Sequence, residues 1–257
     1  MRLYGKFFVM QLKSIMEYKT SFFLSCIGQF LVSFNVFLGM YFMFQRFHNV
    51  NEFTYNEVLL CFGITLMEFS LAESVARGFD NFDFMIRQGD FDRILVRPRS
   101  EILQILGSRI EFSRIGRILQ VVVMFSYGFA VSHIKWNWGK LLTVLFMLIG
   151  GTIVFCGIFL LYASLCFFTI EGLEFINVFT DGAREYGKYP VCIYGKRVLL
   201  FCTFVIPYAL IQYYPLLYLL GRGKPYYCLL PAIACLFIFP CLFFWRLGIK
   251  HYTSCGS

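Results

Sequence analysis

The stretch VLLCFGITLMEFSLAES, residues 58–74, is followed directly by VARGFDNFDFMIRQGDFDRILVRPRS, residues 75–100. The first is apolar enough to cross a membrane, whereas the second carries too much charge to lie in lipid. This alternation runs through the whole chain and predicts an all-α membrane protein that forms one domain over residues 1–257. Six transmembrane helices are expected, at about 21–44, 58–74, 118–131, 141–168, 198–214 and 228–245.

The composition also indicates that lipid is part of the solvent. Hydrophobic residues make up 59% of the chain and charged residues 15%, whereas soluble domains have roughly 45–50% and about 25%. Of the 23 Lys and Arg, 18 share one side of the membrane if the N-terminus is cytoplasmic, and 5 lie on the other side. Because cationic residues in short loops resist translocation, both termini are predicted to be cytoplasmic. The net charge of +8 is then explained by topology rather than by nucleic-acid binding.

Two further elements are expected at the membrane boundaries. Residues 1–20 predict an amphipathic helix on the membrane surface, because Leu3, Phe7 and Met10 recur on one face. Near the other end, Pro207 and Pro215 interrupt a long apolar run. We therefore expect the span at 198–214 to be followed by a short re-entrant helix before the last span.

The Arg-rich segment 75–117 is predicted to be cytoplasmic and to contain a short helix. Gly89 breaks the segment, Asp90 can cap a helix through residues 92–96, and Pro98 stops that helix. Interleaved carboxylates repel phosphate, so a nucleic-acid patch is disfavoured. A mixture of charged and apolar side chains suits protein docking, and the alternative is a solvated loop with charge pairs.

Two polar residues inside the predicted spans are candidates for a substrate path. Ionisable groups within a membrane are functional candidates by default, which singles out Glu68. The alternative places Glu68 among the lipid headgroups, as we expect for Glu73, whose carboxylate is available to Arg77 at i+4. Asn35 is an uncharged group able to hydrogen-bond between helices.

No catalytic or metal-binding pattern is found in the sequence. Residues Gly182 to Lys188 fit the start of the phosphate-binding pattern G-x-x-x-x-G-K-[ST], but Tyr189 replaces the hydroxyl residue and Pro190 obstructs the following helix. The chain alone is therefore not expected to bind ATP. The ten cysteines form no C-x-x-C pair and the three histidines are far apart, so neither a metal site nor a disulfide framework is predicted.

Several motifs resemble one family of membrane proteins. RQGDFDRILVRPRS, residues 87–100, resembles the intracellular coupling segment of type 2 ABC exporter permeases. EYGKYP at 185–190, FVIPYA at 204–209 and the ending YTSCGS at 252–257 look like the six-span branch labelled as viologen or multidrug exporter permeases. The resemblance covers essentially the whole chain.

This resemblance implies a permease subunit of an ATP-driven exporter in the bacterial cell membrane. Such a chain forms the substrate path with a second permease, either a homologous partner or itself. A separate ABC ATPase binds ATP and Mg²⁺, so this chain needs no cofactor of its own. The resemblance also implies an ATPase-docking helix, in which Phe91, Ile94 and Leu95 would fill a groove on the ATPase. Its residues are Gly89, Asp90, Phe91, Asp92, Arg93, Ile94, Leu95 and Pro98.

Two other classes are alternatives. A membrane-embedded lipid-modifying enzyme needs a convergent set of His, Asp or metal ligands, and an ion-coupled secondary transporter favours inverted repeats with several intramembrane charges. Neither pattern stands out in the sequence. The transported substrate stays open, because one fold hosts many cargoes.

Overall fold

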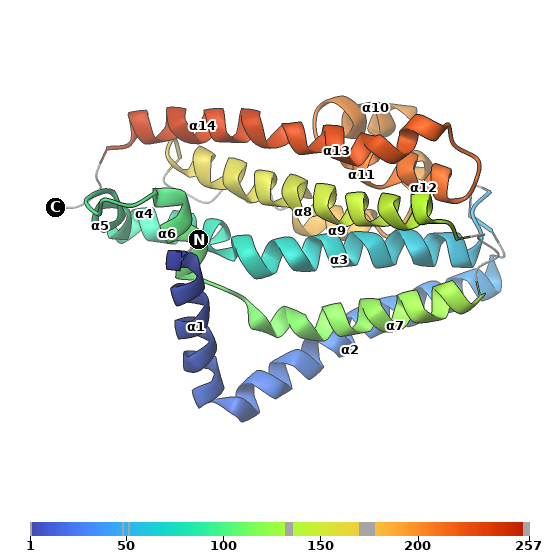
Figure 1. The fold of residues 1–257 in the computed structure, drawn as a ribbon, viewed down its shortest axis with the longest axis horizontal. Coiled ribbons are helices and arrows are strands. Elements are labelled where there is room, and N and C mark those ends of the chain that lie inside the picture. The colour runs from blue at the N-terminus through green and yellow to red at the C-terminus, as the bar shows by residue number, and fades with distance from the viewer. Residues whose placement is uncertain (1, 48, 51, 132–135, 170–177, 254–257) are drawn as a thin grey trace.

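The computed structural model describes residues 2–47, 49–50, 52–131, 136–169 and 178–253, and these residues are mainly helical. Five long helices run side by side, and a sixth lies across them at one end (Figure 1). The long helices are α2 (Lys19–Arg46), α3 (Tyr55–Asp80), α7 (Ile115–Val131), α8 (Trp138–Cys166) and α14 (Ile238–His251).

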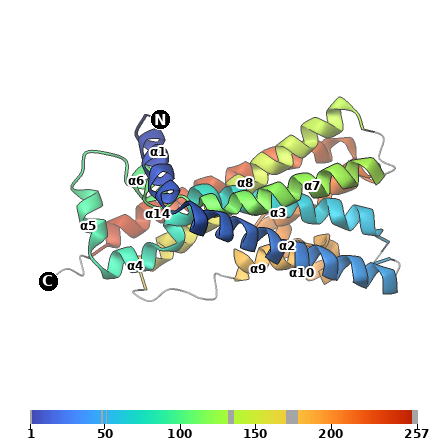
Figure 2. The ribbon, with the colours of Figure 1, turned by 90° about the horizontal axis from the view of Figure 1, so that it is seen from below.

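Helix α3 is the centre of the bundle. It packs against α7 on one side and α8 on the other, while α2 covers α7 and α14 covers α8 (Figures 1 and 2). The buried face of α3 continues past the predicted span at 58–74, through Ala76 and Phe79. For this reason α3 ends only at Asp80, and the Arg-rich segment that follows is shorter than predicted.

Four helical stretches are long and apolar enough to cross a membrane: Lys19–Arg46, Tyr55–Arg87, Trp138–Leu165 and Pro225–His251. A bent pair of helices, Lys196–Phe204 and Tyr208–Leu219, makes a fifth if both pieces belong to one span. Helix α7, with 17 residues, is not among these stretches. The prediction of an all-helical membrane protein is thus confirmed, and the described residues support four or five of the six expected spans.

The predicted span at 198–214 is broken, because the chain bends by 86° within it. Helix α10 (Lys196–Phe204) ends there, and α11 (Tyr208–Ile211) and α12 (Tyr213–Leu219) continue in a new direction. Pro207 explains the position of the bend, since it lacks a backbone N–H and disfavours helical geometry at the residue before it. The break therefore falls inside the predicted span rather than after it.

The last long helix is preceded by three short helical pieces. These are η4 (Pro225–Leu229), α13 (Leu230–Ala234) and η5 (Cys235–Phe237), which lead into α14 without a gap. Gly150 on α8 lets α13 approach closely, since a Cβ there would lie only 2.6 Å from the Pro231 carbonyl oxygen.

Short helices gather at one end of the bundle. These are α1 (Arg2–Glu17), α4 (Phe82–Arg87), α5 (Asp90–Leu95) and α6 (Glu101–Ser108) (Figure 2), together with η1 (Phe112–Arg114). Helix α1 packs against α6 and η1. The ring of Phe8 lies 4.9 Å from that of Phe112, and Gln11 donates a hydrogen bond of 2.8 Å to the Ser108 carbonyl. The helix predicted over residues 1–20 is therefore present and packs against this end of the bundle.

Candidate functional site

Helix α5 is the short helix that the Arg-rich segment predicted. Gly89 occupies its N-cap with φ of 70° and ψ of 9°, a left-handed conformation that glycine adopts at little cost. Asp90 is the first residue of the helix and not its cap, and its carboxylate lies 3.3 Å from Arg93. The helix ends at Leu95, three residues before Pro98.

Phe91 points into the chain itself. It is fully buried, and its ring lies 5.1 Å from Phe82, 5.3 Å from Phe167 and 5.0 Å from Tyr252. Trp245 completes the same aromatic cluster. These rings come from α4, α5, α14 and the segment after α8, so they fasten α5 to the bundle. The prediction that Phe91 fills a groove on another protein is therefore wrong for this structure.

Other contacts hold the rest of α5. Ile94 is also buried, and Gln104 on α6 donates hydrogen bonds to the carbonyls of Ile94 and Arg99, at 3.3 and 3.2 Å. On the opposite side, the Tyr252 hydroxyl donates to the Asp92 carboxylate at 3.0 Å. Helix α5 is thus fixed both to α6 and to the residue that follows α14.

The outward side of this region is small, partly apolar and cationic. Leu95 is 43% exposed and Val96 85% exposed. The side chain of Arg93 and the residues from Arg97 to Arg99, which include Pro98, are exposed beside them. Of the predicted docking residues, Arg93, Leu95 and Pro98 are therefore accessible to a partner, whereas Phe91 and Ile94 are not.

A buried ion cluster joins three long helices near this end. Glu73 on α3 is 1% exposed and lies 3.1 Å from Arg77, 3.1 Å from Arg114 and 2.5 Å from Arg117. Arg117 also donates to Gln29 on α2 at 2.8 Å. The expected pair with Arg77 is confirmed. Sequence reasoning missed the other two arginines, although their spacing of three residues at the start of a predicted span placed them on one helix face.

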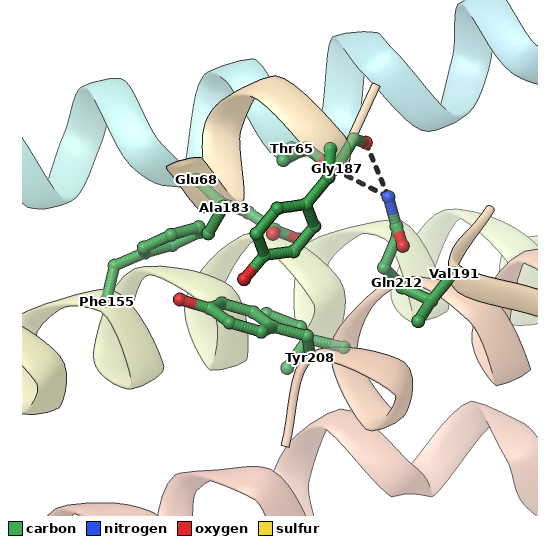
Figure 3. Close-up of a pocket in the computed structure, with 10 residues that line it drawn as sticks. Thr65, Glu68, Phe155, Ala183, Gly187, Val191, Tyr208 and Gln212 are labelled. Atoms are coloured by element: carbon green, nitrogen blue, oxygen red, sulfur yellow. Dashed lines mark hydrogen bonds between the residues drawn. The ribbon is translucent and has the colours of Figure 1, made fainter. Parts of the chain in front are cut away.

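Glu68 lies in a small internal cavity between α3, α8 and α9 (Asp181–Tyr186) (Figure 3). The residue is fully buried, and within the described residues neither carboxylate oxygen has a hydrogen-bond partner. Glu68 is therefore enclosed by the chain and does not line an open path in this structure. Asn35 is exposed on α2 and is not among the residues that line the cavity, so these two candidates do not share a site.

The segment that closes this cavity lies between α8 and α10 in the chain. Gln212 donates from Nε2 to the carbonyls of Gly187 and Tyr189, at 2.5 and 3.2 Å, and to the hydroxyl of Thr65 at 3.3 Å. Thr65 is the eleventh of the 26 residues of α3. The chain around Gly187 thus packs against the middle of α3. Residues 170–177 of this segment lie outside the described residues.

The partial phosphate-loop match falls on this same segment. Residues Asp181–Tyr186 are themselves helical, and Lys188 forms an ion pair with Glu185. A phosphate-binding loop instead precedes its helix and leaves the lysine free for phosphate. In the described residues, no group of three or more His, Cys, Asp or Glu side chains is arranged to hold a metal ion.

These features define an apolar helical membrane bundle with a rigid helical element at one end. The sequence pattern of ABC-2 family transporter proteins matches residues 30–256, and the chain therefore belongs to the ABC-2 transporter family. This confirms the resemblance to type 2 ABC permeases, which are the membrane components of ABC transporters and are not themselves catalytic. No curated protein and no solved structure matches the chain.

Proposed function

We propose that this chain is the permease subunit of an ATP-driven exporter. It forms the substrate path with a second permease chain, and a separate ABC ATPase drives both. The observation that carries the proposal is α5, a short helix fixed to the bundle by Phe91 and Gln104 with an accessible tip at Leu95 and Val96. Such an element transmits a partner's movement because it cannot move independently of the helices that hold it.

The proposed topology has six spans and cytoplasmic termini in the bacterial cell membrane. Helix α7 and the bent pair α10 to α12 supply the two spans beyond the four long apolar stretches. The cation bias of 18 to 5 supports this orientation. The contacts of α1 with α6, and of Tyr252 with Asp92, bring both ends of the described chain to the same end of the bundle, as an even number of spans requires.

In this scheme the tip of α5 docks on the ATPase. Leu95 and Val96 supply apolar contact area, and Arg93 at the rim sets orientation by charge. When the ATPase closes, the force passes through the aromatic cluster of Phe91 and Trp245 to α14, and through α4 to α3. ATP hydrolysis is therefore expected only when the ATPase is present.

The test uses a residue that is exposed before docking. Val96→Asp places a charge at the tip without disturbing the core, because Val96 is 85% exposed. Apolar anchors at such interfaces contribute about 1–4 kcal/mol, so binding should weaken roughly fivefold to several hundredfold. Val96→Thr is the matched control, since it keeps the side-chain shape and adds no charge. Ile94→Asp is unsuitable here, because Ile94 is buried and its replacement would damage the fold.

The measurements are co-purification with the ATPase and transport-coupled ATP hydrolysis, after the melting temperature has shown that each variant is folded. We expect Val96→Asp to lose the ATPase or to leave hydrolysis without transport, and Val96→Thr to retain both. If Val96→Asp supports both at the unmodified level, the tip of α5 is not the docking element and the solvated-loop alternative is correct.

A further inference from the structure

The Glu68 carboxylate is exceptional within this chain because nothing in the described structure compensates it. Glu73 lies five residues further along the same helix, is equally buried, and has three arginines around it. Glu68 has neither an ion pair nor a hydrogen bond to either oxygen among the described residues. An unpaired charge in such surroundings costs many kcal/mol, so the site requires a positive partner or a proton.

The residues around the Glu68 carboxylate leave room for its side chain and line the cavity beside it. Gly151 on α8 lies directly against the side chain, and a Cβ at that position would overlap Glu68 Cδ and Oε2. Phe155, one turn along α8, and Tyr208 on α11 line the cavity with aromatic rings (Figure 3). The cavity volume that the centre of a water-sized sphere can occupy is about 10 Å³. That is the room for one water molecule or one small ion.

The polar atoms of the cavity that remain unpartnered are acceptors. Gln212 commits Nε2 to the carbonyls of Gly187 and Tyr189, which fixes the orientation of the amide because carbonyls cannot donate. Its Oε1 is buried and, like both oxygens of Glu68, has no partner in the described residues. The hydroxyl of Tyr208 donates away from these atoms, to the Phe179 carbonyl. Three oxygens therefore lack a donor or a cation.

Oxygen ligands with one negative charge match a small monovalent cation. A divalent ion would leave an uncompensated positive charge in the interior, whereas Na⁺ or K⁺ balances a single carboxylate. Broken helices near mid-membrane coordinate such ions through unwound backbone carbonyls and helix C-termini. The C-terminal end of α9 and the break before α11 both lie at this cavity, through Gly187 and Tyr208.

We propose that the cavity lined by Glu68, Thr65 and Gln212 binds one Na⁺ or K⁺ ion. The ion neutralises the carboxylate and ties α3 to the segment from α9 to α12. Because this segment includes both pieces of the broken helix, the bound ion stabilises its packed arrangement. The ion site is tested in the chain without the ATPase, so its failure and the failure of the proposed transport function can be told apart.

The test is the melting temperature of the purified full chain in lipid nanodiscs, followed by tryptophan fluorescence. Solutions of NaCl, KCl and N-methyl-D-glucamine chloride are compared at equal ionic strength and pH. Once the site is saturated, each tenfold increase in the concentration of the cation that binds should raise the melting temperature by roughly 3–5 °C. Glu68→Gln should abolish this rise. Glu57→Gln is the control, since Glu57 lies on the same helix but pairs with Arg222 at 2.9 Å, and it should retain the rise.

Two results would overturn the proposal. One is an unmodified chain that melts at the same temperature in all three salts, as expected if a proton neutralises Glu68. The other is a cation effect that persists in Glu68→Gln. If Glu68→Gln does not fold, equilibrium dialysis of the unmodified chain and of Glu57→Gln with radioactive sodium and with a radioactive potassium analogue decides the matter. One ion bound per chain supports the site, and no bound ion of either kind rejects it.

Discussion

The ion cluster around Glu73 predicts a large loss of stability when its single carboxylate is neutralised. Glu73→Gln keeps the size of the side chain but removes the charge that compensates Arg114 and Arg117, whose side chains are 10% and 6% exposed. Breaking a buried ion pair by removing one partner costs about 3–5 kcal/mol. For a chain of this size each kcal/mol lowers the melting temperature by about 2–4 °C, so the expected drop is roughly 6–20 °C.

The assay is the melting temperature in nanodiscs, with an exposed ion pair as reference. Arg87→Gln removes a partner of Asp83, and because the Arg87 side chain is 48% exposed the cost should be at most about 1 kcal/mol. Combining Glu73→Gln with Arg117→Gln should recover part of the loss, since one uncompensated charge is then gone. If Glu73→Gln melts within the range of the Arg87→Gln control, the cluster does not hold α2, α3 and α7 together and the reasoning is refuted.

Three other predictions concern packing, topology and nucleotide binding. Gly116→Ala should lower the free energy of unfolding by about 1–3 kcal/mol, because a Cβ there overlaps the α2 backbone. Gly28→Ala is the control and should cause no such loss, because the space around Gly28 is open. Equal melting temperatures of the two variants would contradict the close crossing of α2 and α7 at Gly116. A cysteine at Asn49, in a variant without reactive native thiols, should react with an impermeant reagent in whole cells and one at Gln88 should not; reversed labelling would reject the proposed orientation. Lys188→Ala should leave nucleotide binding of the assembled complex unchanged, because this lysine pairs with Glu185; loss of binding would make the phosphate-loop match real.

The predictions that succeeded rest on local sequence. An apolar run of sufficient length favours a helix in lipid whatever its neighbours are. Gly89 and Pro98 bracket a short helix because their backbone preferences are intrinsic. The Glu73 contact with Arg77 follows from helical spacing alone. Pro207 marked a break in the same way, although the sequence did not place the 86° bend inside the predicted span.

The predictions that failed concern which surface a residue faces. Phe91 was expected to contact a partner, yet its ring packs against Trp245, which is 154 residues away in the chain. The segment around Gly187 is polar, and nothing in its sequence indicated that hydrogen bonds from Gln212 would hold it beside the middle of α3. A polar composition shows that backbone and charges need partners, but it does not show where those partners are.

The sequence by itself determined that this protein is a helical membrane bundle and placed its short helix, because length, hydropathy and backbone preference act within a few residues. Tertiary structure alone decided the contrast between Glu68 and Glu73. Both are acidic residues on one helix, and only the packing of η1 and α7 brings Arg114 and Arg117 to Glu73, while α8 and α9 enclose Glu68 without a counter-charge. The energy of a buried charge depends on the groups that three-dimensional packing brings around it, and those groups are distant in the chain.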